Sequence, residues 1–217
     1  MKKIMFNDKY GLTQAVLEGR KTQTRRLIKC RKTFKGEWVA GFNIHIRPSD
    51  KKVVELPCMY DADEREFEGG EILPRYKVGE IVAIAQNYKD LGYAEISLDI
   101  SPKDYRISRG TLGKSKGWNN KMFVRAEACK HQIRITNVRA ERLQDISDED
   151  CLKEGIIKGK VGSEDTHFMD AYYIPTLKKD PFCTPQGACS YLIDKISGKG
   201  TWENNPYVFV YDFELVK

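Results

Sequence analysis

The segment at residues 19–26, Gly-Arg-Lys-Thr-Gln-Thr-Arg-Arg, holds two side chains whose spacing could support nucleophilic chemistry. Lys21 lies among the arginines of this segment, and like-charge repulsion lowers the pKa of an amine, so that more of it can accept a proton. Such a lysine could activate the Thr24 hydroxyl. The alternative is structural: Lys21 interacts with a helix C-terminus and Thr24 is an ordinary strand residue. The residue types alone favour this second interpretation.

A short helix and a strand must position these side chains. Apolar residues follow helical spacing along 12–16, and Gly19 stands where helices commonly end. The 22–26 segment then alternates as a strand does, which puts Thr24 and Arg26 on one face. The pattern therefore predicts that a helix end delivers the chain into a strand that carries the candidate nucleophile.

Further elements follow along the chain without regular alternation of helix and strand. The patterns predict a β-hairpin at 37–58, strands at 78–88 and 131–143, a helix from Ser147 to Gly155, a helix from Thr184 to Gly198 and a strand at the end of the chain. Polar stretches near 100–120 and 157–183 are predicted to be long loops. This order favours an α+β fold on an antiparallel or barrel-like sheet.

Composition indicates one globular domain. The chain has 217 residues, 41% of them hydrophobic, and no run that approaches a membrane span, so we expect a cytoplasmic protein. The six cysteines are then expected to be reduced. Cys129 and His131 form no recognisable metal motif, and none of the three histidines lies in a catalytic motif, so we expect no metal and no histidine-dependent triad.

The net charge of +6 is unevenly distributed. Basic residues gather in the acid-free segments 20–36 and 106–125, whereas 60–71 is strongly acidic. Such segregation is typical of a positive groove that attracts phosphates. Two solvated basic loops would give the same pattern, and charge alone does not separate the two interpretations.

The 19–26 segment resembles the Gly-x-Lys-x-x-(Glu/Thr)-x-Arg signature of the ASCH domain family. Three other stretches are similar to the family in the expected order: QAVLEG before the signature, 135–156, and TWENNPYVFVYDFEL at the end, the last two resembling its longer, phage- and prophage-associated branch. The resemblance implies a PUA-like β-barrel with flanking helices and an inserted β-hairpin. The whole chain, 1–217, would be a single domain with insertions at about 30–77 and 157–183.

Small bacterial ASCH proteins of known activity are N4-acetylcytidine amidohydrolases, whose catalytic residues are a lysine and a threonine of the signature and a glutamate on a later helix. By resemblance these fall on Lys21, Thr24 and Glu154, and no cofactor is implied. Thr24 would attack the acetamide carbonyl after losing its proton to Lys21, with Glu154 moving protons to the leaving amine. Arg26 would bind substrate or the oxyanion. The implied partner is RNA or a modified nucleoside.

A non-enzymatic RNA-binding module is the competing hypothesis. In it, cations of the basic cleft contact phosphates, while Trp118 or Tyr88 stacks on bases. The candidate substrate- or RNA-binding cations are Arg20, Arg25, Arg26, Lys114, Lys116 and Lys121. A metal-dependent ribonuclease ranks lower, because the sequence has no convincing carboxylate cluster.

Overall fold

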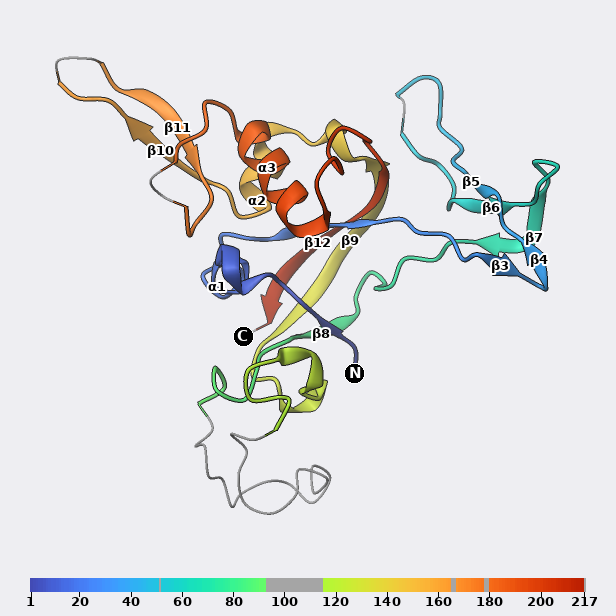
Figure 1. Ribbon diagram of the computed structural model, residues 1–217, viewed down its shortest axis with the longest axis horizontal. Coiled ribbons are helices and arrows are strands. Elements are labelled where there is room, and N and C mark those ends of the chain that lie inside the picture. Colours follow the sequence, from blue (N-terminus) through green and yellow to red (C-terminus); the bar gives the residue numbers. More distant parts are fainter. Residues whose placement is uncertain (51, 93–114, 165–166, 178–179, 217) are drawn as a thin grey trace.

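A computed structural model describes residues 1–50, 52–92, 115–164, 167–177 and 180–216, and it has the predicted mixed α+β architecture (Figure 1). The α-helices described are α1 (Leu12–Leu17), α2 (Asp148–Lys153) and α3 (Pro185–Ser197). The strands are β1 (Lys3–Ile4), β2 (Gln23–Leu27), β3 (Thr33–Phe34), β4 (Glu37–Trp38), β5 (Gly41–Asn43), β6 (Cys58–Tyr60), β7 (Glu66–Glu71), β8 (Ile81–Ile84), β9 (Gln132–Arg142), β10 (Ile157–Val161), β11 (Met169–Tyr173) and β12 (Tyr207–Val216).

A five-stranded sheet in the order β1-β8-β9-β12-β2 forms the centre of the molecule. β12 runs antiparallel to β9 and β2, while β1 pairs in parallel with β8. Both faces of β12 are covered: Val208 and Val210 pack with Leu143, and Phe209 and Tyr211 join the main core. The predicted terminal strand is confirmed, and β8 and β9 confirm the two strands predicted before it.

The helices cluster on the β2 side of this sheet (Figure 1). The Ser147 hydroxyl caps α2 by accepting a hydrogen bond from the Asp150 amide at 3.1 Å. The Thr184 hydroxyl caps α3 in the same way, from the Gly187 amide at 3.0 Å. Gly198 follows α3, so the helix ends predicted from capping residues are confirmed.

The predicted insertion at 30–77 forms two small sheets beside the central one, β3-β4 and β5-β6-β7 (Figure 1). Its hairpin is confirmed, because β5 pairs with β6 and Ile46 bridges to Val53. The hairpin does not extend over all of 37–58 as predicted, since β4 at the start of that range turns back on β3 instead. Trp38 is 61% exposed, so the alternation of apolar residues there does not mark a face buried in a core.

The second polar stretch, 157–183, is not the long loop that its sequence predicts. β10 and β11 form an antiparallel hairpin over five residue pairs, with an ion pair of 2.8 Å between Lys158 and Asp170 on its surface. Apolar residues alternate in IKGKV and MDAYY, but each strand has only five residues and lies within a polar stretch, which explains why the pattern missed the hairpin. Most of the other predicted loop, near 100–120, lies outside the described residues, because 93–114 are not described.

The described strands do not close into the barrel that the resemblance implies. The two edge strands of the central sheet, β1 and β2, do not pair with each other in the described part of the chain. Side chains separate them, because the Arg26 guanidinium reaches across and donates a hydrogen bond to the Met5 carbonyl at 2.7 Å. The sheet is therefore open, and a recess lined by Lys3 of β1 and by Arg26 and Leu27 of β2 occupies the gap.

Candidate functional site

Lys21 enters the interior directly after α1. Gly19, with a φ of +73°, turns the chain out of the helix, and the Lys21 amide donates to the Ala15 carbonyl at 2.9 Å. The Lys21 side chain is only 2% exposed. A buried lysine needs partners for its charge, so its surroundings decide what it can do.

Three oxygens face the Lys21 ammonium. Nζ lies 2.7 Å from the Gln23 carbonyl, 2.8 Å from the Glu154 carbonyl and 2.5 Å from Glu154 Oε2. Three acceptors match the three protons of an ammonium. The carboxylate is the one acceptor of the three that readily takes a proton, so Glu154 can receive it and leave a lone pair on Nζ.

Burial lowers the pKa of Lys21, and the carboxylate of Glu154 opposes that effect. Arg26 adds a smaller lowering by like-charge repulsion. The sequence correctly predicts that the pKa of Lys21 is lowered. It attributes the lowering to neighbouring arginines, whereas burial is the larger cause. Arg20 instead turns to the surface and pairs with Glu18 at 2.5 Å.

Glu154 is placed by the end of α2. It is the residue that follows the last helical position, and Gly155, with a φ of +106°, reverses the chain after it. The Thr22 amide donates to the Lys153 carbonyl at 2.9 Å, which joins this helix end to the start of β2. The predicted juxtaposition of Lys21 and Glu154 therefore follows from two helix ends that meet beside one strand.

Thr24 and the Lys21–Glu154 pair line one cavity of about 500 Å³, called here the lysine cavity. Thr24 is buried, and no hydrogen-bond partner of its hydroxyl is found within the described ranges. Apolar side chains from the N-terminal segment, α1 and α3 complete the wall: Phe6, Leu12, Leu192, Ile193 and Ile196. The cavity thus combines a hydroxyl, an amine and a carboxylate with an apolar lining, which is typical of a small-molecule site.

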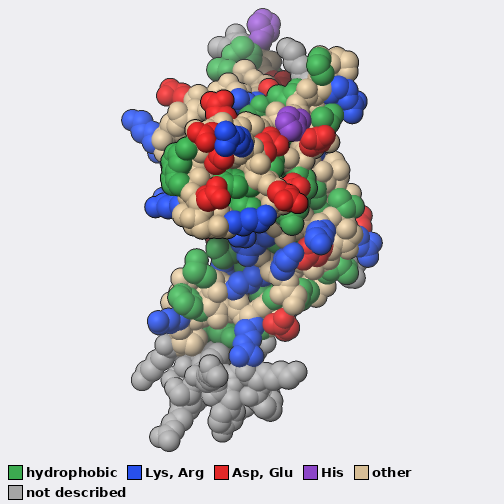
Figure 2. Space-filling model, turned by 90° about the vertical axis from the view of Figure 1, so that its right-hand side faces the viewer, with side chains coloured by type: hydrophobic (Ala, Val, Ile, Leu, Met, Phe, Trp, Pro, Cys, Tyr) green, Lys and Arg blue, Asp and Glu red, His purple; other side chains and the backbone are tan. Residues whose placement is uncertain are grey.

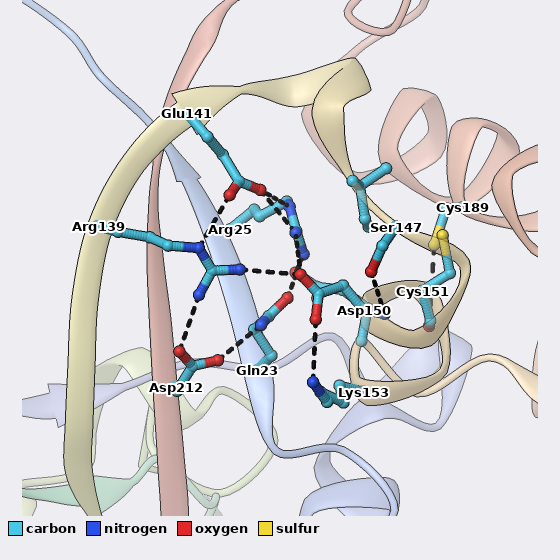
Figure 3. A network of polar contacts seen from close by, with 12 residues as sticks. Gln23, Arg25, Arg139, Glu141, Ser147, Asp150, Cys151, Lys153, Cys189 and Asp212 are labelled. Carbon is cyan, nitrogen blue, oxygen red and sulfur yellow. Dashed lines mark hydrogen bonds and ion pairs between the residues drawn. The ribbon is translucent and has the colours of Figure 1, made fainter. Parts of the chain in front are cut away.

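Arg25 lies in a network of ion pairs at the edge of this cavity (Figure 3). Its side chain is 4% exposed and contacts the carboxylates of Glu141 at 2.7 Å, Glu154 at 3.1 Å and Asp150 at 3.3 Å. Burial alone would lower the pKa of Arg25, but the carboxylates of Glu154 and Glu141 outweigh it and raise it. Arg25 therefore fixes Glu154 Oε1 while Lys21 holds Oε2.

The other predicted binding cations have different surroundings. Arg26 lines the lysine cavity and the recess between β1 and β2. Lys121 lines the lysine cavity, where it pairs with Asp8 at 2.7 Å. Lys116 is exposed with its ammonium over the Phe123 ring, and Lys114 lies outside the described residues.

Of the two aromatic residues predicted to stack on bases, Tyr88 does not lie free on the surface. It is buried in a satellite core with Leu91 and Val124. Trp118 packs partly against the same core. A stacking role for Tyr88 is therefore wrong, because its ring is already covered by protein.

Several residues that shape the lysine cavity were not predicted from sequence. Phe6 comes from the N-terminal segment, and Cys189 and Leu192 come from α3. A hydrogen bond with Cys151 and burial raise the pKa of the Cys189 thiol, so it is a neutral wall residue and no nucleophile. The helical spacing of 189, 192, 193 and 196 predicts an apolar face, but only the fold shows what it covers.

Within the described ranges, no group of three or more histidine, cysteine or acidic side chains is placed to hold a metal ion. None of the helices described is long and apolar enough to cross a membrane. Comparison with known proteins assigns no family: no family model matches the chain, and no significant match was found among curated proteins or solved structures.

Proposed function

We propose that this protein is an amidohydrolase that deacylates N4-acetylcytidine in the lysine cavity. The observation that carries the proposal is the buried contact of 2.5 Å between Lys21 and Glu154 in a cavity that Thr24 also lines. An amine of lowered pKa, a carboxylate and a hydroxyl are the groups that acyl transfer through a covalent intermediate requires. The resemblance to the ASCH family, with its PUA-like fold, points to the same three residues.

The reaction begins with two proton transfers. Lys21 passes a proton to Glu154 Oε2, and the free amine then takes the proton of the Thr24 hydroxyl. The Thr24 oxygen forms a bond to the acetamide carbon, and the Arg26 guanidinium, which keeps N–H groups beyond its bond to Met5, stabilises the oxyanion. The bond from carbon to N4 breaks, and the amine leaves with the proton that Glu154 holds.

Water completes the cycle by attacking the acetyl ester on Thr24. The water loses a proton to the Lys21–Glu154 pair, and the Thr24 oxygen regains one as acetate departs. The net reaction is amide plus water to amine, carboxylate and one proton, which passes to solvent when the product acid ionises. Every other proton moves between groups that face the same cavity, so the scheme needs no external base.

Incubation with N4-acetylcytidine tests the proposal by measuring release of cytidine. We expect turnover by the wild-type protein and loss of about 100-fold or more in Thr24→Ala, because removal of the nucleophile removes the covalent route. Thr22→Ala is a matched control, since Thr22 is the neighbouring threonine and does not line the lysine cavity. Absence of turnover by the wild-type protein at high concentration would overturn the proposal.

A further inference from the structure

The recess between the open edges β1 and β2, called here the edge recess, is a second cavity of about 500 Å³. It adjoins the lysine cavity, because Met5 and Arg26 line both. Two residues of an extended strand span about 7 Å, so Arg26 stands one such step along β2 from Thr24. A ligand that occupies the lysine cavity therefore has a path along β2 into the edge recess.

Positive charge dominates the edge recess. Its described lining holds four cations, Lys3, Arg26, Lys29 and Arg75, and no carboxylate. Figure 2, which views the molecule from the side of the inserted strands, shows Lys and Arg side chains gathered in a hollow at mid-height. This uncompensated charge attracts an anion.

Two of these cations keep N–H groups available to a ligand, although the Arg75 guanidinium also lies over the Tyr76 ring, 5.7 Å from its centroid. Lys3 is occupied by the carbonyls of Lys121, Met122 and Val124. By contrast, Lys29 and Arg75 are exposed, and neither has a carboxylate partner among the described residues. An exposed lysine and an exposed arginine beside an open groove suit phosphate oxygens.

The edge recess also has apolar surface. Leu73 and Met122 are exposed large hydrophobic residues on its rim, and Met5 lies where it meets the lysine cavity. A base can pack on such side chains while its phosphate meets the cations, the combination found in grooves for single-stranded nucleic acids. A free nucleoside carries no phosphate, so it would leave these cations unused.

We infer that the substrate is a single-stranded oligonucleotide in which the acylated cytidine enters the lysine cavity and the adjoining phosphodiester-linked nucleotide lies in the edge recess. This inference rests on the proposed function. Lys29 and Arg75 contact the phosphodiester backbone, and Arg26 stands between the reacting base and its neighbour. The gap that the described strands leave between β1 and β2 thereby provides the entry for a polymeric substrate.

The test compares kcat/KM for N4-acetylcytidine with that for a short oligoribonucleotide carrying one internal N4-acetylcytidine. We expect the oligonucleotide to be the better substrate. In the double variant Lys29→Ala/Arg75→Ala, the ratio of kcat/KM for oligonucleotide to nucleoside should fall about 100-fold, since each of the two charged contacts contributes about tenfold. For the oligonucleotide, the decrease of log(kcat/KM) with log salt should become less steep in this variant, by about 1.4, or 0.7 for each contact.

The matched control is Lys52→Ala/Arg65→Ala, which removes the same charge from exposed residues outside both cavities. A parallel assay with an oligodeoxynucleotide substrate shows whether the protein recognises the ribose. Turnover of either polymer in preference to the nucleoside supports the inference. Preference for the nucleoside, or equal ratios in the two double variants, would overturn it and leave the proposed function standing. No turnover of any substrate would overturn the proposed function, and the inference with it.

Discussion

The two adjoining cavities differ in whether their positive charges are balanced by acceptors on the protein. In the lysine cavity Lys21 is buried and each of its protons has an acceptor, whereas in the edge recess Lys29 and Arg75 are exposed without a carboxylate partner in the described part of the chain. A buried, compensated cation has a defined position and a shifted pKa, which suits proton transfer. An exposed, uncompensated cation suits attraction of a phosphate.

Arg26 belongs to both regions, which is why the difference is informative. Its guanidinium lines each cavity and holds the Met5 carbonyl across the gap between the sheet edges. One strand thus presents a hydroxyl for chemistry at Thr24 and, two residues on, a cation at the start of a binding groove. If compensated and uncompensated charges have these separate roles, substitutions in the two regions should have different effects.

The largest effect is expected at Arg25. Arg25→Ala removes a buried cation shared by Glu141, Asp150 and Glu154. Arg139 and Lys21 still pair with these carboxylates, so we expect a cost of about 3 kcal/mol, the lower end for loss of one partner from a buried ion pair. Urea denaturation measures the change in the free energy of unfolding.

Arg20→Ala provides the comparison for Arg25, because Arg20 is also an arginine of the 19–26 segment but pairs only at the surface. Surface pairs contribute about 0–1 kcal/mol, so its unfolding should be nearly unchanged. Equal destabilisation by the two variants would mean that the network around Arg25 does not hold the site together.

Glu154→Gln should lower kcat on N4-acetylcytidine by about 100-fold or more, since positioned proton transfer contributes at least that factor. The amide can still accept a hydrogen bond from Lys21 but cannot take its proton at neutral pH. Circular dichroism and the urea midpoint confirm that the fold is retained.

Glu149→Gln, an exposed residue of the same helix, is the control for Glu154 and should be as active as the wild-type protein. Turnover by Glu154→Gln at the wild-type rate would show that the reaction does not require proton transfer by the buried pair.

The smallest effect is a shift in the pH profile. In the proposed scheme the Lys21–Glu154 pair must hold one proton to begin the reaction, so kcat/KM should fall as the pH rises through the pKa of Lys21, which lies below its ordinary value of 10.5. Arg26 contributes to the lowering, so Arg26→Gln should move the midpoint of that fall to higher pH. A midpoint that moves to lower pH, or does not move, would show that Arg26 does not influence the amine.

The sequence predicts correctly those parts of the site whose structure depends on local signals. Gly19 ends α1, Ser147 caps α2 and Gly155 follows Glu154, and these local signals are enough to place Lys21 and Glu154 at helix ends. The meeting of those ends depends on tertiary packing. It was expected from the resemblance and not from any spacing in the chain.

Features set by long-range contacts were missed. Closure of the sheet depends on what lies between β1 and β2, and no local pattern shows that Arg26 would reach the Met5 carbonyl. The strands of the hairpin β10–β11 have five residues each and lie within a polar stretch, so their alternation is too short to stand out. The charge runs predicted a basic groove but not its members, because Arg25 and Lys121 are compensated by carboxylates that come from other segments.

The most direct test of the central claim is to look for an acetyl group on Thr24. The protein is mixed with N4-acetylcytidine, quenched in acid at early times, digested and examined by mass spectrometry. The account predicts a transient acetyl ester on the peptide that contains Thr24, absent in Thr24→Ala. Release of cytidine at the wild-type rate by Thr24→Ala, with no acetylated peptide in the wild-type protein, would contradict it.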